Sequence, residues 1–493
     1  MRLLIFAFAI CITQMASSKE SNTYSAAVVE YFPERFSKAF DLKETITKRV
    51  DAYIEILSNI EQDLDIIVYP ESTLQFRSKI YTREDLIDAA SIIPSVADKN
   101  APCSESNGYN EYFVSLSCAA KKYRTYLSVD LIEKSPCVGS KCSDDKWNVY
   151  NTNVVFDRDG IVVASYRKYN LFGEHVNVPD EPMHTTFVTD FGVKFGIFIC
   201  FDIMFNEPAM KLVEQGVKHF IFPLMWFSEL PFLTAVQTQH MWSFENDVVL
   251  LASGANNPRS GSSGSGIYQG RQGPLKMYIN GKEGTKVLVA NVEKVWDSSL
   301  SVENPNADVN EDVDNLKLFY DDLTKYNSFN LDVDQQDYVI KVNDDFQCNF
   351  HVVATNTGKL SDKQSYVYKL VGYSGWRSFQ GQKDGFVQVC AMVTCLDNSL
   401  STCGHRIPSN QDTYPILFED IKVEMKLKEN KNSKQYPNAV LGDLKPLYNE
   451  NFDWKKSEGS RVISLKKPRR FFMTFGIYGR VFEPKTMKIN SEL

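Results

Sequence analysis

Between about residues 23 and 300, short apolar runs alternate with segments of helical periodicity. Residues 25–29 (SAAVV) and 64–68 (LDIIV) predict strands on either side of a helix over 42–60. Further strands are predicted at 124–132, 153–156, 162–164, 193–200 and 219–222, and further helices at 207–215 and 233–244. Strands that alternate with helices predict an α/β layered domain, in which ligands bind where strands end.

Composition and charge narrow the class of protein. The chain has 493 residues, 43% of them hydrophobic and 24% charged, which is typical of a globular protein and excludes a disordered or fibrous chain. The length suggests about two or three domains. A formal net charge of -8 argues against a nucleic-acid partner bound through its phosphates.

The amino-acid composition of the chain changes near residue 300. Residues 302–322 are acidic and weakly apolar, and beyond them runs such as DYVIKV and GFVQVCAMVTC are rich in β-branched and aromatic residues. We therefore expect a first domain at 18–300, an acidic linker at 301–322 and a mostly β domain at 323–493. The Gly/Ser-rich segment 254–266 is expected to be a flexible surface loop, with a pocket lid as the alternative.

The first seventeen residues have the pattern of a secretory signal peptide. Arg2 supplies the positive start, residues 3–13 the apolar stretch and residues 16–18 (ASS) a cleavage site. A buried N-terminal strand is the alternative. The apolar stretch is too short to span a bilayer, and the polar C-terminus has no GPI signal. We expect a secreted, extracellular protein without a transmembrane segment.

If the protein is secreted, its cysteines are expected to form disulfides, and their number becomes informative. Cys11 leaves with the signal peptide, so nine of the ten cysteines remain. Eight fall into two sets of four, at 103–142 and 348–403, and Cys200 lies between them. An odd number in an oxidising compartment leaves an unpaired thiol or a link to another chain.

Common catalytic motifs are missing. The sequence contains no GxSxG, HExxH, GxxxxGK or strand-following GxGxxG motif, and its six histidines are scattered. Cys395 and Cys403 as metal ligands are less favoured than a disulfide. We therefore expect no metal site and no cofactor.

Three reactive residues follow predicted strands. Cys200 ends the apolar run 195–200, where a nucleophile would be held rigidly; the alternative is a small core residue. Glu71 follows the strand at 64–68 and could accept a thiol proton, or be a loop or capping acid. Lys168 follows the strand at 162–164 and could stabilise an oxyanion, or be a solvated charge.

The order Glu71, Lys168, Cys200 across one α/β domain resembles the nitrilase (carbon–nitrogen hydrolase) superfamily. The surrounding sequence is closer still to its vanin/biotinidase branch. The segments that carry the resemblance are 65–72 (DIIVYPES), 150–160 (YNTNVVFDRDG), 168–174 (KYNLFGE), 195–205 (FGIFICFDIMF), 264–268 (GSGIY) and 390–404 (CAMVTCLDNSLSTCG).

The resemblance implies a four-layer αββα nitrilase domain followed by a smaller, mostly β base domain. It implies an amidase in which Cys200 is the nucleophile, Glu71 the general base and Lys168 the oxyanion-stabilising ammonium. Glu174 matches a second, supporting acid. We expect the backbone N–H of Phe201 to help bind the oxyanion.

Trp226 is expected to line the substrate pocket, with a core aromatic as the alternative. We pair the other eight cysteines within their two sets, which leaves Cys200 as a free thiol. The expected disulfides are Cys103–Cys118, Cys137–Cys142, Cys348–Cys390 and Cys395–Cys403, although eight cysteines allow 105 pairings.

The sequence leaves the substrate open between two amides. The first interpretation is a pantetheinase that cleaves pantetheine to pantothenate and cysteamine. The second is a biotinidase that releases biotin from biocytin or biotinyl peptides. A secreted binding protein that keeps the fold without turnover is the third, and it is disfavoured because the three candidate catalytic residues are intact.

Overall fold

The computed structural model describes residues 21–34, 41–75, 81–139, 142–299, 312–358, 365–408 and 413–482. The predicted signal peptide at 1–17 lies outside these residues. In the described part of the chain, helices and sheets form a mixed α/β first domain and an all-β second domain, so the predicted fold class is confirmed.

The first domain contains two six-stranded mixed sheets. In spatial order the first sheet comprises β13 (Lys286–Glu293), β1 (Thr23–Glu30), β2 (Ile66–Val68), β3 (Tyr126–Pro136), β4 (Trp147–Phe156) and β5 (Val162–Arg167). The second comprises β12 (Pro274–Tyr278), β11 (Ser265–Gln269), β10 (Val249–Gly254), β8 (His219–Leu224), β7 (Lys194–Ile197) and β6 (Thr186–Val188). In each sheet three neighbouring strands are parallel, namely β1–β3 and β7, β8 and β10.

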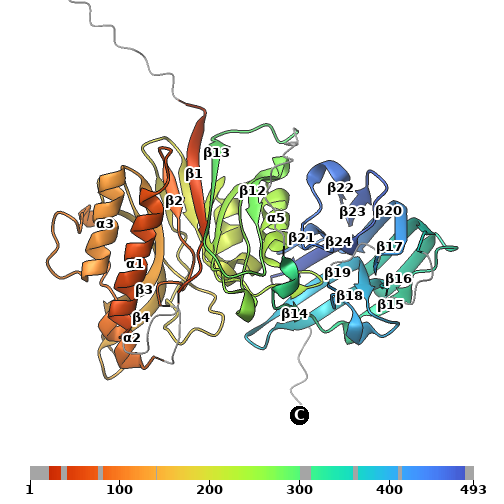
Figure 1. Ribbon diagram of the computed structural model, residues 1–493. Coiled ribbons are helices and arrows are strands. Elements are labelled where there is room, and N and C mark those ends of the chain that lie inside the picture. The colour runs from red at the N-terminus through yellow and green to blue at the C-terminus, as the bar shows by residue number, and fades with distance from the viewer. Residues whose placement is uncertain are drawn as a thin grey trace, which may run out of the picture.

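Helices cover the outer faces of the two sheets. On the first sheet they are α1 (Leu42–Ser58), α2 (Arg83–Ala89) and α3 (Glu111–Tyr123), and on the second α4 (Lys211–Glu214) and α5 (Ala235–Asn246). Figure 1 shows α1–α3 along one side of the molecule and α5 between the second sheet and the C-terminal strands. Helix α5 is buried along its whole length because both neighbours cover it.

Successive side chains of β1 alternate between two core clusters, which explains why the domain has four layers. Ala26 and Val28 belong to the core cluster that includes the second sheet, whereas Ala27 and Val29 belong to the cluster beneath the helices. Successive side chains of a strand point to opposite faces, so an uninterrupted apolar run requires a sheet that is covered on both sides.

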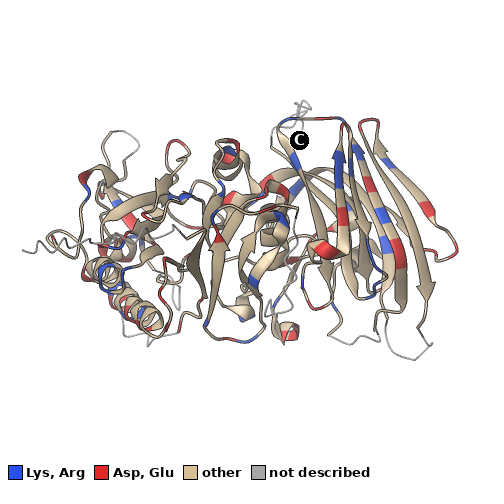
Figure 2. Cartoon of the chain, turned by 90° about the horizontal axis from the view of Figure 1, so that it is seen from above, with Lys and Arg blue, Asp and Glu red and all other residues tan. Residues whose placement is uncertain are grey.

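The C-terminal domain is a sandwich of two five-stranded antiparallel sheets. One sheet comprises β15 (Asn327–Asn330), β18 (Val367–Phe379), β19 (Lys383–Cys395), β24 (Phe472–Val481) and β21 (Ser433–Leu441). The other comprises β16 (Asp337–Asn343), β17 (Phe346–Asn356), β20 (Ile416–Leu427), β23 (Ser460–Leu465) and β22 (Phe452–Ser457). In Figure 2 several of these strands carry blue and red bands, and β20 shows the reason: Lys422, Glu424 and Lys426 alternate with buried Ile421, Val423 and Met425.

Part of the predicted linker packs on the first domain. Residues 312–322 of the segment 301–322 are described, and they include the buried side chains of Val313 and Leu316. Strand β14 (Phe319–Tyr320) pairs in parallel with β9 (Glu229–Leu230). The described part of the connection is therefore attached to the first domain.

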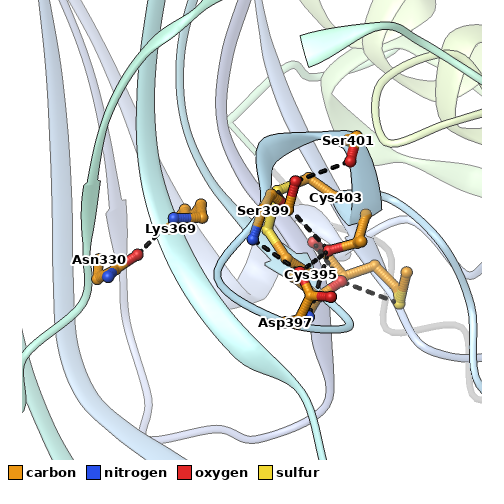
Figure 3. The surroundings of a disulfide bond; sticks show 10 residues. Asn330, Lys369, Cys395, Asp397, Ser399, Ser401 and Cys403 are labelled. Atoms are coloured by element: carbon orange, nitrogen blue, oxygen red, sulfur yellow. Dashed lines mark hydrogen bonds between the residues drawn. A yellow bond between two sulfur atoms is a disulfide. The ribbon is translucent and has the colours of Figure 1, made fainter. Parts of the chain in front are cut away.

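All four expected disulfides are present in the structure, between Cys103 and Cys118, Cys137 and Cys142, Cys348 and Cys390, and Cys395 and Cys403. Figure 3 shows the last of these, which closes the loop that carries Asp397, Ser399 and Ser401. Cys348–Cys390 joins β17 to β19 and so links the two sheets of the sandwich. Cys200 is the free cysteine of the described residues.

The prediction that residues 254–266 form a flexible surface loop is wrong. Nearly all of this segment is buried, and it contains the start of β11. The buried carboxylate of Glu30 accepts hydrogen bonds from the hydroxyls of Ser263 (2.6 Å) and Ser265 (2.5 Å) and from the N–H of Gly264 (3.1 Å). The serines therefore bind a buried carboxyl group, which composition alone did not indicate.

In the described part of the chain, every helix is too short or too polar to cross a bilayer.

Candidate active site

Cys200 lies at the start of a short 3₁₀ turn, Cys200–Met204, that follows β7 after two residues. Its φ of 45° falls in the left-handed region, which a residue with a Cβ seldom adopts. The carboxylate of Asp202 stabilises the turn, since Oδ2 accepts hydrogen bonds from the N–H of Ile199 (3.0 Å) and the hydroxyl of Tyr166 (2.8 Å). The fold thus holds Cys200 in one strained position.

Glu71 approaches Cys200 from the first sheet. It comes shortly after β2, and its side chain is buried. Its Oε2 accepts the N–H of Met225 at 2.9 Å, while the carbonyl of Met225 accepts the thiol of Cys200 at 3.7 Å. The backbone of Met225, just after β8, therefore links the candidate base and the candidate nucleophile.

Lys168 directly follows β5 and is 1% exposed. Its Nζ donates to Oε1 of Glu71 at 2.6 Å and also to Oε1 of Glu174. Glu174 is further fixed by the N–H of Phe172, which donates to its other oxygen. The structure thus places Glu71, Lys168, Glu174 and Cys200 in one cluster, as the sequence predicted them to act together.

Asn151 is a member of the cluster that the sequence analysis did not single out. It lies within β4, and its Nδ2 donates to Glu71 (2.9 Å) and to Glu174 (3.2 Å). The segment YNTNVVFD was part of the family resemblance, but an asparagine inside a strand carries no motif of its own. Asn151 keeps the two carboxylates in position beside Lys168.

Burial and charge set the protonation states of the cluster. Burial raises the pKa of Glu71, and the neighbouring Lys168 only partly opposes this effect. Burial also raises the pKa of Cys200 well above its usual value, and the charge of Glu71 adds to the shift. Burial opposes the charge of Lys168, but Glu174 and Glu71 outweigh it and raise its pKa well above the usual value.

These shifts describe a resting site with a neutral thiol and an ammonium. Burial would raise the pKa of Glu174, but Lys168 outweighs it and lowers that pKa. Glu71, whose pKa is raised, is the better proton acceptor of the two acids.

Two connected hollows meet at Cys200. The larger is a cavity of about 330 Å³ lined by Glu71, Asn151, Lys168 and Glu174 together with Tyr150 and His175. The smaller is a narrow apolar crevice of about 30 Å³, with Phe201, Met204, Trp226 and Phe379 among its walls. Cys200 faces both, so a bound molecule could extend to either side of its sulfur.

The two remaining predicted site residues also lie here. Trp226 lines the crevice and donates from its indole N–H to the carbonyl of Leu233 at 2.9 Å. Phe201 follows Cys200 in the turn, and its N–H makes no hydrogen bond within the part of the chain that the structure describes. This N–H is available to an oxygen of a bound substrate.

No group of three or more His, Cys, Asp or Glu side chains that could hold a metal ion occurs among the described residues.

Comparisons with known proteins agree with this arrangement. Residues 25–258 match the carbon-nitrogen hydrolase family, and residues 316–485 match the vanin C-terminal domain. The two sheets with Glu71, Lys168 and Cys200 at their strand ends thus belong to a hydrolase that acts on carbon–nitrogen bonds other than peptide bonds.

Full-length relatives narrow the class further. "Vanin-like protein 1" of Drosophila melanogaster is 36% identical, with 98% of this chain and 90% of that protein covered. A pantetheinase of Mus musculus is 29% identical (96% and 91% covered), and a biotinidase of Takifugu rubripes is 30% identical (84% and 87% covered). The chain belongs to the vanin family of carbon–nitrogen hydrolases.

Proposed function

We propose that this amidohydrolase cleaves pantetheine to pantothenate and cysteamine through a thioester on Cys200. The observation that carries the proposal is the buried cluster in which Lys168 bonds two carboxylates beside an unpaired thiol at the edge of a cavity. The pantetheinase relatives, aligned along nearly the whole chain, support this substrate.

The reaction begins with proton transfer from the thiol of Cys200 to Glu71. The thiolate attacks the amide carbon, and the oxyanion is stabilised by Lys168 Nζ and the N–H of Phe201. One preorganised donor of this kind contributes about 3–4 kcal/mol to the transition state. Covalent catalysis replaces one high barrier with two lower ones.

Glu71 then gives its proton to the departing amine, which is a poor leaving group without it. After the amine has left, Glu71 takes a proton from water, and the resulting hydroxide attacks the thioester carbon. The C–S bond then breaks, the carboxylic acid leaves, and the thiolate of Cys200 takes the proton back from Glu71. A carboxyl that acts as base, acid and base again benefits from the raised pKa that burial gives Glu71.

The decisive experiment compares purified wild type with Cys200→Ala, Glu71→Gln and Lys168→Met, on pantetheine and on biocytin. All three variants are expected to lose turnover, because they lack the nucleophile, the proton acceptor and the oxyanion-stabilising ammonium, respectively. Lys369→Met is the matched control, since Lys369 is also a buried lysine, bonded to Asn330 in the second domain (Figure 3). Hydrolysis by Cys200→Ala would end the proposal.

Biotinidase activity is the alternative that the comparisons favour next, because a biotinidase aligns with 84% of the chain. The ratio of kcat/KM for pantetheine and biocytin, measured side by side, decides between the two. A higher value for biocytin would replace the pantetheine assignment without changing the mechanism.

We also propose that the protein is secreted. Four disulfides support folding in an oxidising compartment. Expression in eukaryotic cells with and without residues 1–17 tests this: the full chain is expected in the medium, and the truncated chain inside the cell. A full chain that stays inside the cell would refute the proposal.

A further inference from the structure

The turn that carries Cys200 is contacted by a buried arginine of the other domain. Arg480 lies in β24, is 3% exposed, and donates from Nε to the carbonyl of Met204 at 2.9 Å. Met204 is the last residue of the turn that begins at Cys200. Carbonyls at the end of a helical turn have no donor within the turn, and Arg480 supplies one.

Arg480 makes no ion pair with a described carboxylate. Its second hydrogen bond goes to the carbonyl of Phe386 (2.6 Å), and its guanidinium lies over the rings of Phe205 (5.5 Å) and Phe379 (5.1 Å). Burial lowers its pKa, and no carboxylate is among the charges that act on it. A buried cation without a counter-ion destabilises a fold, so its place is better explained by its contact with the turn than by domain docking.

Lys383, the first residue of β19, approaches the end of the same turn. Its Nζ donates to Oδ1 of Asn170 at 2.7 Å and lies 4.3 Å from the ring centre of Phe205. Asn170 in turn donates from both its N–H and its Nδ2 to Oδ1 of Asp202, each at 2.9 Å. Lys383 is therefore connected through Asn170 to the acid that stabilises the turn.

The hairpin that Lys383 closes also forms part of the site wall. Phe379, the last residue of β18, and Gln380, in the turn before β19, line the crevice beside Cys200. The ring of Phe379 lies 5.6 Å from that of Phe201. The second domain thus contacts the turn at both its backbone and its side chains.

We propose that Arg480 and Lys383 are positioning residues, which hold the turn Cys200–Met204 so that the thiol of Cys200 and the N–H of Phe201 meet the substrate carbonyl together. The inference rests on the proposed role of Cys200 as nucleophile. In this proposal, residues of the C-terminal domain position the catalytic turn of the first domain.

The test uses the full-length protein with Arg480→Lys, Lys383→Met and Lys383→Arg. Loss of one such hydrogen bond is expected to lower kcat for pantetheine about 10-fold in Arg480→Lys and about 3-fold in Lys383→Met, while KM changes less than about 2-fold. Lys383→Arg keeps a donor at this place and is expected to restore most of kcat. The rate at which iodoacetamide alkylates Cys200 is measured in the same variants and is expected to change with kcat.

The matched control is Lys456→Met. Lys456 Nζ also bonds across the domain boundary, to Glu245 on α5 at 2.7 Å, but Glu245 lies outside both hollows. An equal loss of kcat in this control would show a general docking effect and would overturn the inference.

The remaining outcomes separate this inference from the proposed function. If Cys200→Ala is inactive and both Arg480→Lys and Lys383→Met keep wild-type kcat and alkylation rate, the positioning role is refuted and the nucleophile stands. If Cys200→Ala is active, both proposals fail. If Arg480→Lys does not fold, the Lys383 pair decides alone, because Lys383 is exposed enough to be replaced without unfolding.

Discussion

Replacement of Asp202 by asparagine tests how the site is held. Asp202 is fully buried, and its two oxygens accept four hydrogen bonds: Oδ2 from Ile199 and Tyr166, and Oδ1 twice from Asn170. In asparagine one of these oxygens becomes an NH₂ group. Two of the four donors then lose their acceptor, whichever way the amide is turned.

The magnitude follows from that count. A hydrogen bond to a charged group contributes about 1.5–3 kcal/mol, so Asp202→Asn is expected to lower the free energy of unfolding by about 3–6 kcal/mol. Tyr166→Phe removes one donor and leaves the carboxylate, so it is expected to lose about half as much. Asp202→Asn is also expected to lower kcat at least about 10-fold, because the hydrogen bonds of Asp202 hold the turn that keeps Cys200 at its left-handed φ.

Unfolding in guanidinium chloride, followed by tryptophan fluorescence, gives the free energy of unfolding. The value of kcat is measured without denaturant, where the variants are folded. If Asp202→Asn were as stable as wild type, the four donors would not be holding an ionised carboxylate. If it were unstable but fully active, the turn would not depend on Asp202. Either result would refute this account of the site.

Three further changes have definite signs. Glu174→Gln removes an anion that raises the pKa of Glu71, so the acid limb of kcat/KM should move to lower pH; an unmoved or raised limb would contradict the coupling. Burial lowers the pKa of His240 to about 4, so the unfolded state binds a proton below about pH 6.5 before the folded state does. This group should contribute about 3 kcal/mol to the fall in stability between pH 6.5 and 4, in addition to the contribution of His219, whose pKa burial also lowers to about 4. His240→Gln should flatten that decline in denaturant midpoints, and a parallel decline would refute the assignment. Replacing Cys348 and Cys390 together by alanine opens a loop with a sequence separation of 42 and should lower the free energy of unfolding by about 4 kcal/mol, whereas an unchanged midpoint would show that the link between the sheets is dispensable.

The sequence was most informative where a local pattern coincides with a chemical group. Cys200, Glu71 and Lys168 each follow an apolar run, and the ends of strands in layered α/β domains lie at a common edge. Pattern and residue type made them candidates, each with a structural alternative, and the resemblance to the nitrilase superfamily assigned them catalytic roles. The two-domain division followed in the same way, from the change to β-branched and aromatic runs after residue 322.

The residues that the sequence did not reveal act through distant contacts. Asn151 sits inside a strand, and Arg480 lies 280 positions after Cys200, so no local spacing relates them to the site. The prediction of a flexible surface loop at 254–266 was wrong for a related reason. Glycine and serine predict a mobile loop unless a buried carboxyl group such as that of Glu30 binds them, and Glu30 comes from β1, far away in the sequence.

The burial of Cys200 has a consequence for how the protein is made. Disulfides form and rearrange by attack of thiolates, and the oxidation of a cysteine also proceeds through its thiolate. Burial keeps Cys200 as a thiol once the fold has closed, because it raises the pKa of that group. In the proposed mechanism Cys200 must stay reduced, and the environment that makes it depend on Glu71 for activation also withholds it from exchange with the four disulfides.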